Sequence, residues 1–319
     1  MRFRLDRIAF VSYVPVALAL AFADFYVRQN PAYVVERYIP DVLAGVYEAP
    51  FIYRPLAPWL IHTFTSLSGL SPLAALGISR FLGLLAALVA FHIYLRRWQP
   101  AGACVVATLA MAALLPLTFT NSWPVPGTYL ELTLFSLGCL SIAARRDWLF
   151  AAILIVAAFN RETSAFLLVL WLASRARELP RLTWFARGAA LGAAWLTIFV
   201  GVRWFYGLKT YKVIVLAENL GYLRFFDASI EPRLRVFGWF WLAMLIVPVI
   251  LAIRGAMRPS TPSIARDAVV VGLLFVGTCL VSASIVETRV LVPAFPLFAP
   301  AALAFVTTAR RKPPHPDVS

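Results

Sequence analysis

The sequence contains few of the residues that bind metal ions or form disulfides. Its 319 residues include three cysteines and three histidines. Cys104, Cys139 and Cys279 all fall inside apolar runs and lack the spacing of a metal site, so we expect them to be buried as small apolar side chains. The histidines are scattered and have no metal-binding neighbour at helical spacing, which argues against a zinc site. The sequence leaves the need for another divalent metal undecided.

Nucleotide-binding and nucleophile motifs are also missing. The sequence has no glycine-rich phosphate loop, no Walker sequence and no Gly-x-Ser-x-Gly elbow. Transport driven by ATP bound to this chain is therefore disfavoured. We find no internal repeat and no stretch with the composition of a soluble domain.

Charge is scarce as well, at 14% of the residues against 61% hydrophobic residues. A soluble domain normally carries about a quarter charged residues. The apolar runs are about 17 to 25 residues long, which is the length that a helix needs to cross a bilayer. They lack the alternation of barrel strands. We therefore expect an all-α fold, namely a polytopic transmembrane helical bundle of about ten spans or half-spans, as a single integral-membrane domain over residues 1–309.

The net charge of +14 would suggest a nucleic-acid partner in a soluble protein. In a membrane protein, however, basic residues collect in cytoplasmic loops. Six segments expected on the inner side hold 17 of the 29 Lys and Arg residues, which places both termini in the cytoplasm. We thus expect a multi-pass protein of the cytoplasmic (inner) membrane that contacts membrane lipids and no nucleic acid. Residues 310–319 read as a disordered basic, proline-rich cytoplasmic tail.

The first outer loop, at about residues 28–72, carries most of the polar chemistry of the first quarter. Asp41 is a candidate general base for an acceptor hydroxyl, or alternatively a helix cap after a proline. Glu48 and Asp24, which is expected to emerge with the loop, are its rivals. Arg54 stands between apolar residues, where a guanidinium can hold a phosphate by paired hydrogen bonds or reach lipid headgroups.

A polar break interrupts the middle of the chain. Asn160, Arg161 and Glu162 separate two apolar stretches of about 12 residues, each roughly 18 Å of helix, whereas the hydrocarbon layer is about 30 Å thick. Basic clusters flank both ends of this segment, so two short helices fit the positive-inside rule better than one span. Arg161 and Glu162 would then lie below the outer surface. Either they line a substrate site, or they form a salt bridge that joins the two half-helices.

Other charged residues lie where the inside bias of basic residues does not explain them. Lys209 belongs to a second outer loop at about 206–236, and Glu287 and Arg289 flank a tight outer turn. Cations outside the inner loops need another reason to be there, and an anionic ligand is the simplest. We therefore group Lys209, Glu287 and Arg289 with the candidate substrate-binding residues.

Three of these segments resemble motifs of a known group. They are the end of the first loop, Pro50-Phe51-Ile52-Tyr53-Arg54-Pro55-Leu56, the break Asn160-Arg161-Glu162-Thr163, and Glu287-Thr288-Arg289-Val290-Leu291-Val292-Pro293 before the last span. Their order and sidedness are similar to the GT-C superfamily of membrane glycosyltransferases. The resemblance implies a GT-C-like bundle that takes a sugar from a polyprenyl-phosphate carrier and passes it to an acceptor on the extracytoplasmic face.

The resemblance also implies roles for individual residues. Its first-loop catalytic carboxylate corresponds to Asp41, which would deprotonate the acceptor in an inverting displacement. Arg54 and Arg289, with Arg161 or Lys209, would stabilise the charge that grows on the departing lipid phosphate. Many relatives add a soluble C-terminal domain, whereas this chain ends in a short tail, so a protein partner is expected to help recognise the acceptor. The alternative hypothesis is a carrier or flippase for an anionic lipid or solute, because buried charges suit such a pathway too.

Overall fold

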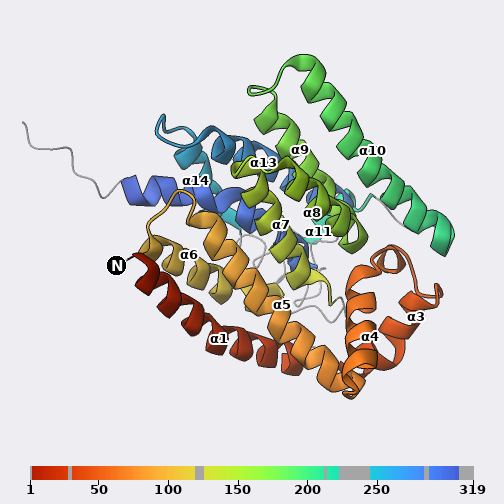
Figure 1. The fold of residues 1–319 in the computed structure, drawn as a ribbon. Coiled ribbons are helices and arrows are strands. Elements are labelled where there is room, and N and C mark those ends of the chain that lie inside the picture. The colour runs from red at the N-terminus through yellow and green to blue at the C-terminus, as the bar shows by residue number, and fades with distance from the viewer. Residues whose placement is uncertain are drawn as a thin grey trace, which may run out of the picture.

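The computed structural model describes residues 2–27, 31–118, 126–211, 214–222, 245–283 and 287–308 (Figure 1). All regular structure within these ranges is helical, which confirms the expected all-α class. The tail at 310–319 and residues 223–236 of the second predicted loop lie outside the described residues.

Four helices are long and apolar enough to cross a membrane, as an α-helical membrane protein requires. They are α1 (Arg2–Val27), α5 (Pro72–Leu95), α10 (Arg181–Tyr206) and α13 (Ser263–Ser282). Shorter apolar helices accompany them: α6 (Ala101–Leu114), α7 (Thr128–Ala143), α8 (Asp147–Asn160), α9 (Ala165–Arg175), the helix Leu245–Ala256 and α14 (Ala294–Thr308). Proline stands at four of these starts, where its missing N–H leaves no donor unpaired. Pro72 is the first residue of α5, and Pro100, Pro180 and Pro262 directly precede α6, α10 and α13.

The helices run back and forth between two ends of the bundle. The helices α1 and α5 are antiparallel (Figure 1), because Asp6 at the start of α1 contacts Arg96 at the end of α5, with Nε and Oδ1 2.9 Å apart. We call this the arginine end, since Arg96, Arg145, Arg175 and Arg258 all lie there. The opposite end, which we call the loop end, holds the first predicted loop.

The first predicted loop is itself largely helical. It contains α2 (Pro31–Tyr33), the π-helical turn η1 (Val34–Tyr38), α3 (Ile39–Leu43), the 3-10 turn η2 (Phe51–Tyr53) and α4 (Leu56–Ser68). Tyr38, Val42 and Ile52 are buried in a small core together with Leu76 of α5 and Val202 of α10. This small core is separate from the larger apolar core of the bundle, and it fixes the loop against the ends of two long helices.

Two details of this region bear on the sequence expectations. The helix α4 lies within the loop predicted at about residues 28–72, and it leaves Leu60 and Leu67 exposed, as suits a helix lying in a membrane interface. Asp24 does not emerge with the loop. It is fully buried in α1, with Oδ2 3.3 Å from Nε of Arg80 in α5, because a carboxylate at that depth needs an opposite charge.

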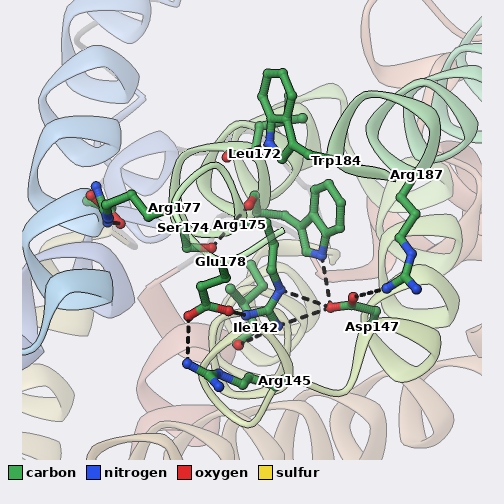
Figure 2. Close-up of polar contacts among 12 residues, drawn as sticks. Ile142, Arg145, Asp147, Leu172, Ser174, Arg175, Arg177, Glu178, Trp184 and Arg187 are labelled. Carbon is green, nitrogen blue, oxygen red and sulfur yellow. Dashed lines mark hydrogen bonds and ion pairs between the residues drawn. The ribbon is translucent and has the colours of Figure 1, made fainter. Parts of the chain in front are cut away.

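An ion-pair network closes the arginine end (Figure 2). Asp147 at the start of α8 accepts hydrogen bonds from Nε1 of Trp171, from Nε and Nη2 of Arg175, and from Nη1 of Arg187. Arg175 also donates to Glu178 at 2.6 Å. The network therefore joins α8, α9 and α10, and it keeps both ends of the α8–α9 hairpin on the arginine side of the bundle.

The helices differ in how much of their surface is buried in the bundle. The helices α5 and α7 lie at its centre, where Leu88 and Phe135 are almost fully buried. By contrast, α10 buries only Gly188, Val202 and Tyr206 along its 26 residues. A helix that is apolar on nearly all sides and exposes most of them is suited to contact lipid.

Candidate functional site

A cavity of about 400 Å³ lies at the loop end, between the first loop, the α8–α9 break, α10 and α13. Four of the eight residues proposed from the sequence line it: Arg54, Arg161, Glu162 and Glu287. Further lining side chains include Phe51, Thr163, Phe166, Phe199, Arg203, Tyr211, Thr278, Cys279, Ser282 and Val290. We call this space the site cavity. It brings together segments that are more than 200 residues apart in the sequence.

The polar break between α8 and α9 is the structural centre of the site cavity. The helix α8 ends at Asn160, and α9 begins at Ala165 after the 3-10 turn η4 (Glu162–Ser164). Asn160 is buried, and its Nδ2 donates to the carbonyl of Gly127 at 3.2 Å. The same carbonyl accepts a bond from the backbone N–H of Glu131, so the Asn160 side chain fixes the break against the start of α7.

Arg54 and Glu162 form a paired salt bridge across the site cavity. Nη2 of Arg54 lies 2.5 Å from Oε1 of Glu162, and its Nε lies 3.3 Å from Oε2. Arg54 is held between η2 and α4 and lies over the ring of Phe51, 5.5 Å from the ring centroid. The two-point contact expected between Arg54 and a phosphate is thus made here with a carboxylate, and it joins the first loop to the α8–α9 break.

Arg161 combines the two interpretations that the sequence left open. It lines the site cavity, and its Nη1 lies 2.8 Å from Oε2 of Glu131 in α7. The hydroxyl of Thr163 donates to the other oxygen of Glu131. Both Arg161 and Glu131 are almost fully buried. Glu131 was missed from the sequence, although a single carboxylate within an apolar helix is itself a signal of a buried partner.

Glu287 and Arg289 form a third pair beside the site cavity. Nη2 of Arg289 lies 2.9 Å from Oε2 of Glu287, just before the turn η5 (Thr288–Leu291). Glu287 lines the cavity, whereas Arg289 is only 1% exposed and lies behind it, 5.9 Å from the ring centroid of Phe51. Burial raises the pKa of the Glu287 carboxyl. The neighbouring cations Arg289, Arg161 and Arg54 lower it by more than burial raises it, so the pKa lies below the ordinary 4.5.

Lys209 connects two loops and is not among the described lining residues of the site cavity. Its Nζ donates to the backbone carbonyls of Gly45 at 3.2 Å and Tyr47 at 2.7 Å. Its backbone N–H donates to the hydroxyl of Tyr53, which in turn donates to the carbonyl of Gly207. These bonds hold the segment after α10 against the first loop.

The two proposed catalytic carboxylates, Asp41 and Glu48, are also not among the described lining residues. Asp41 lies half-buried in α3, and its carbonyl accepts hydrogen bonds from the backbone N–H groups of Val46 and Tyr47 as the helix ends. Glu48 is exposed on the loop that follows. The structure therefore brings Arg54, Arg161, Glu162 and Glu287 to one cavity and leaves Asp41 and Glu48 on the first loop outside its described lining.

Arg203 is a lining residue that the sequence reading passed over as part of a span. It belongs to the last turn of α10, and its guanidinium carbon lies 3.5 Å from the ring centroid of Phe199 and 4.6 Å from that of Tyr53. Its Nη1 donates to the carbonyl of Phe199 at 3.2 Å. The sequence did contain a signal for Arg203, because a charged residue near the end of an apolar helix often marks a functional site.

An apolar groove of about 540 Å³ adjoins the site cavity. Its described lining comes entirely from α13: Val270, Leu273, Leu274, Gly277, Thr278 and Val281. Thr278 lines both the groove and the site cavity. A cavity with charged side chains in its lining and an apolar surface therefore meet at one residue of a helix that is long enough to cross a membrane.

The described residues hold no group of three histidine, cysteine, aspartate or glutamate side chains that could bind a metal ion. Comparisons with protein-family models, with curated proteins and with solved structures gave no match to this chain. The chemistry of the site must therefore be argued from its own residues.

Proposed function

We propose that this protein is a GT-C-like membrane glycosyltransferase, which moves a sugar from a polyprenyl-phosphate carrier to an acceptor at the outer face of the cytoplasmic membrane. The observation that carries the proposal is the site cavity, where guanidinium groups and carboxylates from four distant segments meet at one end of an apolar helical bundle. Glycosyl transfer from a phosphate needs both groups, namely a base for the acceptor and cations for the departing phosphate.

The groove along α13 favours a lipid-borne donor over a soluble one. A polyprenyl phosphate is an anion attached to a hydrocarbon chain. The cavity offers charged side chains, the groove offers an apolar surface, and the two share Thr278. The sequence also lacks a glycine-rich phosphate loop, which a soluble nucleotide donor would often use. The phosphate and sugar would occupy the site cavity, and the hydrocarbon would lie along α13.

The proposed reaction is a single inverting displacement. A carboxylate accepts the proton of the acceptor hydroxyl while that oxygen bonds to the anomeric carbon. The bond between the anomeric carbon and the phosphate oxygen breaks, and its electron pair leaves with the lipid phosphate, whose charge the arginines stabilise. We propose Glu287 as the base. It lines the cavity, and within the described residues one hydrogen bond from Arg289 leaves its second oxygen available, whereas Glu162 is held at both oxygens by Arg54. Asp41, the carboxylate suggested by the family resemblance, is the competing base.

The proposal also orients the protein. The arginine end would face the cytoplasm with both termini, following the inside bias of basic residues, and the loop end would face outward. About ten spans or half-spans would then cross or enter the bilayer. A protein partner would help to present the acceptor at the loop end.

The test is sugar transfer by purified protein in lipid nanodiscs, measured with defined radiolabelled polyprenyl-phosphate sugars. Replacing a general base typically costs about 10² to 10⁴ in rate. We expect Glu287→Gln to lose transfer on that scale while Asp41→Asn retains it, with thermal melts used to check that both variants fold. If Asp41→Asn loses transfer and Glu287→Gln retains it, the base is Asp41. If wild-type protein transfers no sugar from any donor but moves the lipid across liposomes, the carrier hypothesis replaces the proposed function.

A further inference from the structure

Among the residues that the structure describes, the charges around the site cavity do not balance pair by pair. Arg54 pairs with Glu162, Arg161 with Glu131, and Arg289 with Glu287. Arg203 also lines the cavity, but it makes no ion pair with any residue that the structure describes. A guanidinium in an apolar helix without a counter-charge is costly, and such residues commonly mark a ligand site.

Arg203 is held in place without using up its hydrogen-bonding capacity. Its guanidinium carbon lies over the rings of Phe199 and Tyr53, at 3.5 and 4.6 Å from their centroids. Within the described residues, its single hydrogen bond runs from Nη1 to the Phe199 carbonyl, whereas an arginine has five N–H donors. The two ring contacts and the hydrogen bond restrict the side chain, so an anion would meet a group that has already lost part of its freedom.

We infer that Arg203 is the anion receptor of the site cavity and that its ligand is a phosphate group carried on a hydrocarbon chain. The planar fork of Arg203 matches two phosphate oxygens. The hydrocarbon is inferred from the groove on α13, which meets the cavity at Thr278. The inference deepens the proposed function, since it rests on that function for the sugar that the phosphate would carry, but lipid-phosphate binding can be measured without any sugar.

If Arg203 only stabilised the fold, its replacement would have a different effect from the loss of an anion receptor. A cation in the last turn of a helix is stabilised by the helix dipole, and the two aromatic contacts add to this. Loss of that role would lower the melting temperature of the unliganded protein but would leave the affinity for phosphate compounds unchanged. Affinity is therefore the readout that separates the two roles.

The experiment is a ligand titration of full-length protein in detergent micelles, followed by the shift in melting temperature. The probes are farnesyl phosphate, farnesol and inorganic phosphate. We expect saturable stabilisation of the wild type by farnesyl phosphate and little by farnesol, with Arg203→Gln weakening the apparent affinity by about tenfold or more. Arg187→Gln is the matched control, because Arg187 belongs to the same helix but lies at the arginine end, paired with Asp147. It should bind farnesyl phosphate as the wild type does.

Several outcomes would overturn the inference. Equal affinity of Arg203→Gln and wild type for farnesyl phosphate removes Arg203 as the receptor. Equal affinity for inorganic phosphate and farnesyl phosphate removes the hydrocarbon part of the ligand. If Arg203→Gln does not fold, Arg203→Lys keeps the charge without the fork, and unchanged affinity in that variant would likewise contradict the role.

Failure of this inference is distinguishable from failure of the proposed function. Binding that depends on Arg203, together with no transfer from any sugar donor, leaves the receptor in place and removes the glycosyltransferase. Sugar transfer by the wild type, together with phosphate affinity that Arg203→Gln does not change, removes the receptor alone.

Discussion

Individual residues in this protein show how an apolar chain accommodates charge. Asp24 and Glu131 lie within helices that are otherwise apolar, and each faces an arginine from another helix, namely Arg80 and Arg161. Desolvating such a pair costs about as much as the attraction returns, so the pair adds little net stability. Removing one member is different, because the other charge is then left buried without compensation.

The Glu131–Arg161 pair allows this to be measured. We predict that Glu131→Gln lowers the free energy of unfolding by about 3 kcal/mol, because Arg161 would remain buried without a full counter-charge. Thermal or urea unfolding in detergent micelles measures the change. Glu48→Gln is the control, since Glu48 is exposed and should alter stability by about 0.5 kcal/mol or less. Equal effects of the two substitutions would show that Glu131 contributes no more than a surface residue.

At the scale of elements, short helices are joined end to end by polar side chains. The helices α8 and α9 have 14 and 11 residues, so each is about 17 to 21 Å long, shorter than the hydrocarbon layer of about 30 Å. The break between them, at the loop end, is closed by Asn160 and Arg161, and their ends at the arginine end are closed by the Asp147 network (Figure 2). Side-chain bonds at both ends thus hold helices that span only part of the layer.

Asp147 should therefore contribute more to the stability of the fold than other acidic residues at the same end. It accepts hydrogen bonds from Trp171, Arg187 and the buried Arg175. We predict that Asp147→Asn lowers the unfolding free energy by about 2 kcal/mol, because hydrogen bonds to charged groups are worth about 1.5–3 kcal/mol. The measurement is the melting temperature in micelles, supported by the fluorescence of tryptophan near the network.

The matched control is Asp267→Asn. Asp267 pairs with one arginine, Arg177, whose side chain is 56% exposed, and exposed pairs contribute about 0–1 kcal/mol. A loss at Asp267 as large as that at Asp147 would contradict the view that the network joins α8, α9 and α10.

At the scale of the whole molecule, the two ends differ in chemistry. The arginine end carries exposed arginines such as Arg145 and Arg187. The loop end carries the site cavity and apolar side chains suited to an interface, among them Leu60 and Leu67. This asymmetry underlies the proposed orientation, with the cavity facing outward.

Cysteine labelling tests that orientation. We predict that Leu208→Cys, at the loop end, reacts with a membrane-impermeant maleimide in intact cells, because Leu208 is 80% exposed. Ser260→Cys, an exposed position at the arginine end, should react only after the membrane is permeabilised. The wild type, whose three cysteines are buried, provides the background. The reverse pattern would invert the orientation and place the cavity on the cytoplasmic side.

The sequence located most of the helices because apolar runs and prolines act locally. The two apolar stretches of about 12 residues that were predicted on either side of the polar break correspond to α8, which has 14 residues, and α9, which has 11. It also located the break at Asn160, since charge within an apolar run is visible without knowing its neighbours. The sequence did not predict which residues the charged side chains contact, and Glu131 and Arg203 were read as ordinary members of spans.

What the sequence by itself determined is the helical class, the apolar character of the helices and the set of charged residues that cannot lie in lipid alone, since each follows from composition and spacing. Only the tertiary structure decided which charges meet. Arg54 reaches Glu162 across 108 positions, and Arg161 turns to Glu131, because helix packing brings those side chains within hydrogen-bond distance. The same packing left Asp41 half-buried in α3 of the first loop and Arg203 in the lining of the site cavity. Such choices depend on contacts between distant segments, which no local pattern encodes.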